Sequence, residues 1–134
     1  EIYIVENPSF FAVLCGKEKK DDVRRAYMCM NGQPRLAGLI VLDLLAKSGT
    51  KVYYAGDLDP EGIQIAQKLS QYYKGEFYYW HMETADYEKC RSEEVISLKR
   101  MKILERITDE RLRPVVEMIR ECRTAGYQER LIYF

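Results

Sequence analysis

The chain has 134 residues, of which 47% are hydrophobic, so it is long enough to bury one core, and we expect residues 1–134 to form a single domain. Lysine plus arginine and aspartate plus glutamate number 21 each, which argues against a domain that holds nucleic acid by bulk charge alone. There is no signal peptide and no apolar run near the roughly 20 residues of a membrane helix, which predicts a soluble cytoplasmic protein without a membrane partner.

The chain begins at Glu1 and enters the apolar stretch Ile2–Val5 directly, which favours a piece of the C-terminal part of a longer protein. If that protein meets DNA, we expect its other parts to supply much of the affinity. The four cysteines lie far apart and form no Cys-x-x-Cys pair, so neither a zinc site nor a redox motif is indicated. We expect reduced thiols, most of them buried.

The first ninety residues alternate short apolar runs with helical patterns, which is typical of βαβ units around a parallel sheet. Glycine, proline and asparagine mark the turns between these runs. In chain order, the predicted elements are a strand at Ile2–Val5, a short helix through about Leu14, a charged surface loop or turn at Lys17–Arg25, a strand at Ala26–Met30, a helix from the turn at 31–34 to about Ser48, a strand at Lys51–Ala55, a helix from Pro60 to about Gly75, a strand at Glu76–Met82, and helical segments from about Asp86 and over Asp109–Arg123.

These elements predict an α/β fold of the Rossmann-like kind, with a mainly parallel sheet of about four strands flanked by helices and a helical C-terminal third. The helix after residue 34 has a wide apolar face. The charged stretches of the C-terminal third are interpreted as solvated helix faces. The helix from Pro60 is expected to bury Ile63, Ile65, Ala66 and Leu69.

Three acidic residues follow predicted strands, at the edge where the loops of an open parallel sheet converge on one crevice. Glu6 follows the first strand, and Asp57 and Asp59 follow the third. The Asp-x-Asp spacing lets both carboxylates point to the same side of an extended segment. Because Mg²⁺ in proteins takes oxygen ligands and only a few carboxylates, these residues predict a magnesium site in which Mn²⁺ can substitute.

A structural role explains the same residues. Asp59 precedes a proline, so it is a candidate N-cap, and Glu61 then favours the helix dipole. Glu6 alone can equally be a surface or capping carboxylate. Gly56 and Gly62 can be glycines that allow a tight turn and close helix packing.

Two segments resemble a known family. Ile4-Val5-Glu6-Asn7-Pro8, and Gly56-Asp57-Leu58-Asp59-Pro60-Glu61-Gly62 with Ile65-Ala66 after it, look like the Toprim domain of type IA topoisomerases, DnaG-type primases and related nucleases. The resemblance covers roughly residues 1–80. With Asn31-Gly32-Gln33-Pro34, the chain is more similar to the C-terminal Toprim-like domain of bacterial JetD-related proteins of the Wadjet anti-plasmid system than to topoisomerases or primases, in which glycine often follows the glutamate.

The resemblance implies a Toprim fold and a metal-binding, catalytic role for Glu6, Asp57 and Asp59 in the cleavage of DNA phosphodiesters, for anti-plasmid defence or topoisomerase-related processing. It implies DNA as a partner, bound largely through an N-terminal region, and it allows SMC-like complex subunits and a homodimer as further partners. Similarity to the JetD-related group suggests Glu129 as an additional acidic residue, for which a surface helix position is the alternative.

Further polar residues are candidates for binding a substrate phosphate. Asn31 and Gln33 follow the second strand, where side-chain amides and a helix start can hold phosphate oxygens, and Arg35 is the nearest cation. Turn chemistry, capping and a first-turn surface arginine are the alternatives. His81, the only histidine, is either a general base or phosphate contact or a partly buried structural residue.

The expected chemistry is metal-assisted hydrolysis of a phosphodiester, in which one or two Mg²⁺ ions polarise the phosphoryl oxygen, activate water and stabilise the leaving oxygen. Glu6 is either a ligand or a general acid or base. The alternative is a DNA-processing scaffold or interaction domain with a structural or weak metal site, whose aromatic segment at 77–80 would form a docking surface. A phosphatase-like enzyme with Asp57 as nucleophile is disfavoured, because that motif usually follows the first strand of its domain.

Overall fold

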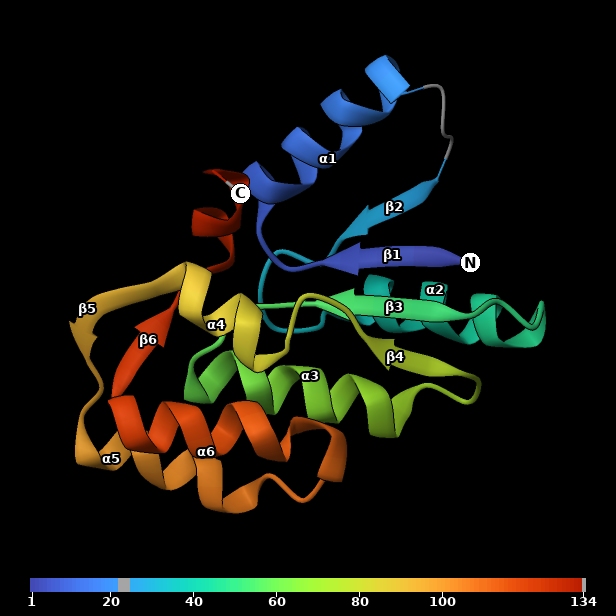
Figure 1. Cartoon of the computed structure of the whole chain (residues 1–134). Helices are drawn as coiled ribbons and strands as arrows, with labels where there is room; N and C mark the ends of the chain where they lie inside the picture. Colours follow the sequence, from blue (N-terminus) through green and yellow to red (C-terminus); the bar gives the residue numbers. More distant parts are fainter. Residues whose placement is uncertain (22–24, 134) are drawn as a thin grey trace.

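The chain folds around a parallel four-stranded sheet with the strand order β2-β1-β3-β4, which confirms the predicted α/β fold (Figure 1). The computed structural model describes residues 1–21 and 25–133. Its elements are β1 (Ile2–Val5), α1 (Pro8–Asp21), β2 (Ala26–Cys29), α2 (Leu36–Lys47), β3 (Val52–Ala55), α3 (Pro60–Tyr72), β4 (Phe77–Tyr79), α4 (Thr84–Cys90), β5 (Arg91–Val95), α5 (Leu98–Met101), η1 (Lys102–Arg106), η2 (Glu110–Leu112), α6 (Arg113–Cys122), β6 (Thr124–Gly126) and η3 (Gln128–Tyr133), where η denotes a 3₁₀ helix.

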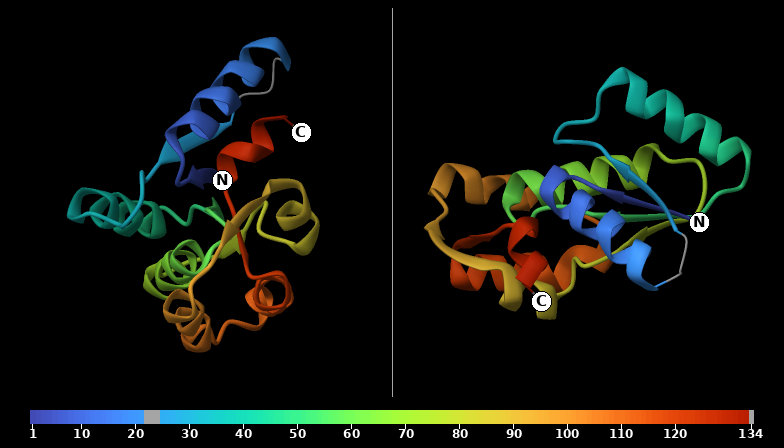
Figure 2. Two further views of the ribbon diagram at one scale, coloured as in Figure 1. Left: turned by 90° about the vertical axis from the view of Figure 1, so that its left-hand side faces the viewer. Right: turned by 90° about the horizontal axis from the view of Figure 1, so that it is seen from above.

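Helices cover both faces of the parallel sheet. The helix α1 and the C-terminal η3 lie side by side on one face, and α2 and α3 lie on the other (Figure 2). On the α3 face, Tyr54 is fully buried and stacks with Phe77, which in turn contacts Tyr73 at the end of α3. One part of the core therefore lies between the sheet and α3, and the core continues to α4 and α6, where Tyr87 and Ile119 are fully buried.

The opposite face of the sheet carries a row of tyrosines, one from each strand and all in register. Tyr3 stacks on Tyr53 with ring centroids 5.0 Å apart, and Tyr53 stacks on Tyr78 at 5.1 Å. Tyr27 completes the row beside Tyr3. Phe77 is buried on one face while Tyr78 is exposed on the other, so the aromatic segment at 77–80 is divided between the two faces, and its role as a docking surface stays a prediction.

The helix α3 begins as predicted. The Asp59 carboxylate accepts a hydrogen bond from the Gly62 N–H at 2.7 Å, and a proline occupies the first helical position. The predicted apolar residues Ile63, Ile65, Ala66 and Leu69 are all buried. All four cysteines are free thiols, of which Cys90 is buried and the others are half-buried.

The C-terminal third is mainly helical, as predicted, and it also contains a second, two-stranded antiparallel sheet of β5 and β6 that the sequence did not indicate. Both strands lack an alternating apolar pattern: β5 reads Arg-Ser-Glu-Glu-Val and is largely exposed, and β6 has three residues. Leu58 and Gly126 also pair through two backbone hydrogen bonds of 2.7 and 3.0 Å. This pairing ties the Asp-x-Asp segment to the C-terminal part of the chain.

The helix α1 continues to Asp21, so the expected surface loop over 17–25 is helical in its first part. Residues 22–24 of that loop lie outside the described residues. The sequence from Lys17 onward is rich in lysine and glutamate, which are good helix formers, and no glycine or proline follows Gly16 to stop the helix. The charged residues from Lys17 to Asp21 therefore belong to a helix and not to the expected loop.

The helix α2 has the predicted apolar character, but only Leu42 is fully buried. Leu36, Ile40 and Leu44, spaced four residues apart on one side, are 75%, 50% and 60% exposed. This apolar stripe (residues 36, 40 and 44) has no covering element among the described residues. Within the same part of the chain, no helix combines the length and apolar character needed to cross a membrane.

Candidate metal centre at the carboxyl edge of the sheet

Glu6 and Asp57 lie next to each other because their strands are neighbours. β1 and β3 pair in parallel with Val5 opposite Ala55, so the two chains leave the sheet together. The Glu6 carboxylate accepts a hydrogen bond from the Asp57 N–H at 3.1 Å. A Cβ atom at Gly56 would lie 3.0 Å from Glu6 Oε2, so a larger residue here would require the Glu6 carboxylate to shift by a few tenths of an ångström.

The Asp57 carboxylate is held by the C-terminal part of the chain. Its Oδ1 accepts a hydrogen bond from the Gln128 N–H at 2.7 Å. Burial raises the pKa of Asp57 to about 6; the negative charges of Glu6 and Glu129 act in the same direction, against the hydrogen bond from Gln128. Burial likewise raises the pKa of Glu6. Both carboxylates therefore lack a compensating positive charge.

Asp59 has a different environment. Its Oδ1 caps α3, and its Oδ2 lies 3.5 Å from Arg100 Nη2. The same guanidinium donates two hydrogen bonds of 2.8 Å, from Nε and Nη2, to the two carboxylate oxygens of Glu61. Burial raises the pKa of Asp59 to about 6, although the cap and Arg100 oppose this. The structural reading of Asp59 as an N-cap is thus confirmed, and its role as a metal ligand stays a prediction.

The donors of this cluster suit a hard cation. Among the described residues, no group of three or more histidine, cysteine, aspartate or glutamate side chains stands in an arrangement that could hold a metal ion. Glu6 and Asp57 nevertheless present two carboxylates from adjacent strand ends. Two carboxylates with remaining positions for water and phosphate are the usual protein share of a magnesium site. These two residues fit Mg²⁺, whereas Asp59 would first have to leave Arg100.

Two buried polar atoms next to the cluster have no hydrogen-bond partner among the described residues, namely the Tyr54 hydroxyl and Gln128 Nε2. Gln128 is 1% exposed, and its Oε1 accepts the Asn7 N–H at 2.9 Å. Since a backbone N–H can only donate, this bond fixes the amide so that Nε2 faces away from Asn7. The Tyr54 hydroxyl would lie 3.2 Å from a Cβ at Gly56, so it borders the space occupied by Glu6.

Neither Tyr54 nor Gln128 was identified as a site residue from the sequence. A tyrosine within a buried strand and a glutamine near the C-terminal end carry no pattern that points to an acidic cluster. The neighbour Glu129, which was a candidate, is exposed and acts on Asp57 through its charge. The signal that could have located Gln128 is its place two residues after Gly126, but the Leu58 pairing is visible only in three dimensions.

The predicted phosphate-binding residues form the exposed turn after β2. Asn31 adopts a left-handed backbone with φ 54°, which suits asparagine before Gly32. Arg35 occupies the N-cap position of α2 without a capping side-chain hydrogen bond. Asn31, Gln33 and Arg35 are exposed at the same edge as Glu6, beyond the edge strand, and their role in phosphate binding stays a prediction.

His81 follows β4 at the same edge. Its backbone is left-handed with φ 53°, and its Nδ1 lies 3.1 Å from Asp86 Oδ1. The side chain is 40% exposed, so His81 is partly buried but reachable from solvent.

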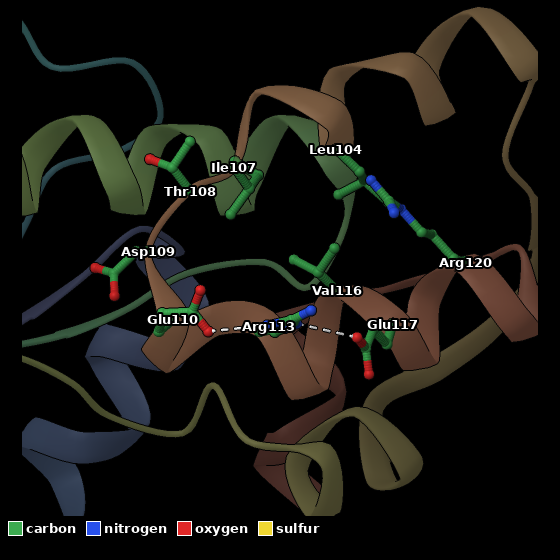
Figure 3. A pocket seen from close by; sticks show the side chains of 9 residues that line it. All are labelled: Leu104, Ile107, Thr108, Asp109, Glu110, Arg113, Val116, Glu117 and Arg120. Carbon is green, nitrogen blue, oxygen red and sulfur yellow. Dashed lines mark hydrogen bonds and ion pairs between the residues drawn. The ribbon is translucent and has the colours of Figure 1, made fainter.

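A hollow of about 400 Å³ lies apart from this cluster, against α6 and η2 (Figure 3). Three of its charged side chains pair with one another, since Arg113 lies 3.2 Å from Glu110 and 3.3 Å from Glu117. None of the predicted site residues lines it.

The fold and the cluster define an α/β domain with an acidic centre at the carboxyl edge of a parallel sheet. The chain belongs to the family described as "Protein of unknown function C-terminus (DUF2399)", whose model matches residues 1–133. No curated protein matches the chain. The family match does not by itself indicate an activity.

Proposed function

We propose that this chain is a Toprim-type, metal-dependent catalytic domain that cleaves DNA phosphodiesters, as part of a longer protein related to the JetD nucleases. The observation that carries the proposal is the pair Glu6 and Asp57. The two carboxylates lie at adjacent strand ends, and burial together with nearby negative charge raises the pKa of each. Such a pair is costly without a cation and favourable with one, which is the usual state of a catalytic metal centre.

Glu6 and Asp57 are the residues that would hold Mg²⁺ or Mn²⁺ directly. When bound, the ion supplies Lewis-acid stabilisation of the phosphoryl group and of the leaving oxygen. Asp59 joins the ligands if its contact with Arg100 opens, and the helix cap through Oδ1 can persist in that state.

The chain's own residues orient the reacting groups. The Gln128 N–H fixes Asp57, and the Asp57 N–H fixes Glu6, so the two carboxylates are positioned before any substrate arrives. The oxygen of Glu6 that does not accept this hydrogen bond is available to take a proton from water or to give one to the leaving oxygen. DNA is the proposed substrate and partner, bound largely by parts of the longer protein because this chain has no net charge.

Further proposed partners are SMC-like subunits and a second copy of the protein, in the cytoplasm of a bacterium. These follow from the resemblance to the JetD-related group and depend on the same function. A membrane partner is not part of the proposal.

The decisive experiment is a calorimetric titration of the chain with Mg²⁺ and Mn²⁺, followed by plasmid nicking with the full-length parent. Asp57→Asn should abolish metal binding and nicking. Asp59→Asn retains the helix cap, because asparagine caps as well as aspartate, and so isolates any role as ligand. The exposed Glu76→Gln at the other end of the sheet is the matched control. Equal metal binding by the wild type and Asp57→Asn would refute the proposal.

A second candidate function, an interaction domain, is favoured by the apolar stripe of α2. Leu36 and Leu44 are 75% and 60% exposed, and exposed apolar residues in a row are typical of protein contacts. Leu36→Gln/Leu44→Gln in the full-length parent should abolish assembly with partner subunits and leave metal binding unchanged. If the domain is catalytic, Asp57→Asn should abolish metal binding and leave assembly with partner subunits unchanged.

A further inference from the structure

A small pocket of about 100 Å³ lies between α1, the end of β4, α4 and η3, on the face of the sheet opposite α3. Three apolar side chains and four polar ones surround it. The polar side chains comprise two lysines, the only histidine and one aspartate. The lining residues are Phe10, Leu14, Lys17, His81, Asp86, Lys89 and Leu131.

The geometry of His81 prepares it to receive a ligand. A non-glycine residue in the left-handed region is uncommon, costs on the order of 1 kcal/mol, and is often found at ligand sites. Asp86 can only accept from the His81 Nδ1, so this ring nitrogen carries a hydrogen and Nε2 is left for another partner. The imidazole is held further by ring contacts with Phe10 and Trp80 at 6.2 and 4.5 Å.

The aspartate in the pocket does not cancel its positive charge. Both oxygens of Asp86 are used, one by His81 and the other by the Glu83 N–H at 3.0 Å in the cap of α4. Burial opposes ionisation, but these hydrogen bonds outweigh it and lower the pKa of Asp86. Within the described residues, neither Lys17 nor Lys89 forms an ion pair. Two ammonium groups and one imidazole thus surround a single carboxylate, that of Asp86, whose two oxygens both already accept hydrogen bonds.

The pocket is adjacent to the acidic cluster through two elements that line both. On α1, Asn7 contacts Gln128 beside the cluster, and Phe10 lines the pocket one turn later. On η3, Gln128 contacts Asp57, and Leu131 lines the pocket three residues later. Phe10 follows Asn7 within one turn, whereas Lys17 follows it by ten residues, roughly 15 Å along the helix axis, so the pocket extends away from the cluster and its lysines do not pair with the carboxylates.

We propose that this pocket binds a phosphate oxyanion through Lys17, Lys89 and His81. Its small volume and apolar floor suit one compact anion with an attached group. The source of the phosphate, unlike the site itself, rests on the proposed function. If that function holds, the ligand is a backbone phosphate of the DNA near the cleavage position. Free phosphate and mononucleotides share the chemistry and are the competing sources.

Because His81 is the only histidine, its imidazole resonances report on the pocket alone. The chain is titrated with inorganic phosphate in the presence of a chelator, and the imidazole signals are followed by NMR. We expect a saturable shift that becomes at least tenfold weaker in affinity in Lys17→Ala/Lys89→Ala. Lys47→Ala/Lys74→Ala removes the same charge from exposed positions elsewhere and should bind as the wild type does. No saturation, or equal affinity in the two double variants, overturns the proposal.

A short single-stranded oligonucleotide without terminal phosphates is titrated in parallel. A saturable shift with the oligonucleotide, lost in Lys17→Ala/Lys89→Ala, assigns the pocket to DNA phosphates. Binding of inorganic phosphate alone overturns that source and leaves a site for free phosphate. Asp57→Asn, measured in the same way, should keep the shift, so a failed metal centre and a failed phosphate pocket give different results.

Discussion

The raised pKa of Asp57 predicts that the cluster destabilises the metal-free domain above about pH 6. The pKa of Asp57 rises from its ordinary 3.8 to about 6, and each unit corresponds to roughly 1.4 kcal/mol, which gives an upper value of about 3 kcal/mol for ionising Asp57 in the folded chain. Charge sharing with Glu6 and the weaker hydrogen bond that an amide accepts from Gln128 reduce the expected effect of Asp57→Asn to about 1 to 2 kcal/mol.

The direction with pH follows from proton binding. Below about pH 4 the carboxyl is protonated in both the folded and the unfolded chain, so it contributes nothing to the difference. Between about pH 4 and 6 the folded chain retains the proton and the unfolded chain releases it, so the free energy of unfolding falls as pH rises. Asp57→Asn lacks this loss and should be more stable than the wild type at pH 7.5 but not at pH 4.

Urea denaturation in a chelating buffer at both pH values measures the effect. Glu76→Gln removes an exposed carboxylate whose only ion pair among the described residues is a solvent-exposed one with Lys51 at 3.7 Å, so it should change the free energy of unfolding by less than about 0.5 kcal/mol at either pH. Excess Mg²⁺ should stabilise the wild type at pH 7.5 and leave Asp57→Asn unchanged. If Asp57→Asn changes the free energy of unfolding equally at pH 4 and pH 7.5, ionised Asp57 does not destabilise the folded, metal-free chain.

Three further predictions follow from single contacts. Gly62→Ala would place its Cβ against the Asp57 carbonyl oxygen and should cost about 1 to 3 kcal/mol by urea denaturation, together with weaker metal binding by calorimetry. Arg100→Met removes a half-exposed pair with Glu61 and should cost only about 0.5 to 1 kcal/mol, while NMR titration should show a higher pKa for Asp59. Leu44→Gln on the exposed side of α2 should leave the free energy of unfolding within about 0.5 kcal/mol of the wild type, and a larger loss would show that this side chain is buried.

The parallel sheet could be predicted because each strand is a short apolar run with a turn signal after it. Once Glu6 and Asp57 were placed after neighbouring strands, their proximity followed from the parallel arrangement. The cap by Asp59 was also visible, since the following proline and Gly62 mark a helix start. These features depend on local sequence, which a single chain displays.

What could not be predicted depends on contacts between distant segments. The strand β5 is polar and exposed, and only its pairing with β6 defines it. Gln128 reaches the cluster because the chain near Gly126 pairs with Leu58. The exposure of α2 is equally invisible in its sequence, because an apolar helix is ordinarily expected to be covered.

The hydrogen bonds of Gln128 to Asn7 and Asp57 can form only late in the synthesis of the chain. Asn7 and Gln128 are separated by 121 positions, so the residue that completes the cluster is synthesised long after the strands that carry the carboxylates. At ribosomal rates of about 10 residues per second, the delay is on the order of 10 s. During that interval the growing chain holds Glu6 and Asp57 without the bond that orients Asp57. A cell making this protein is therefore exposed to an oriented acidic centre only after residue 128 has been synthesised.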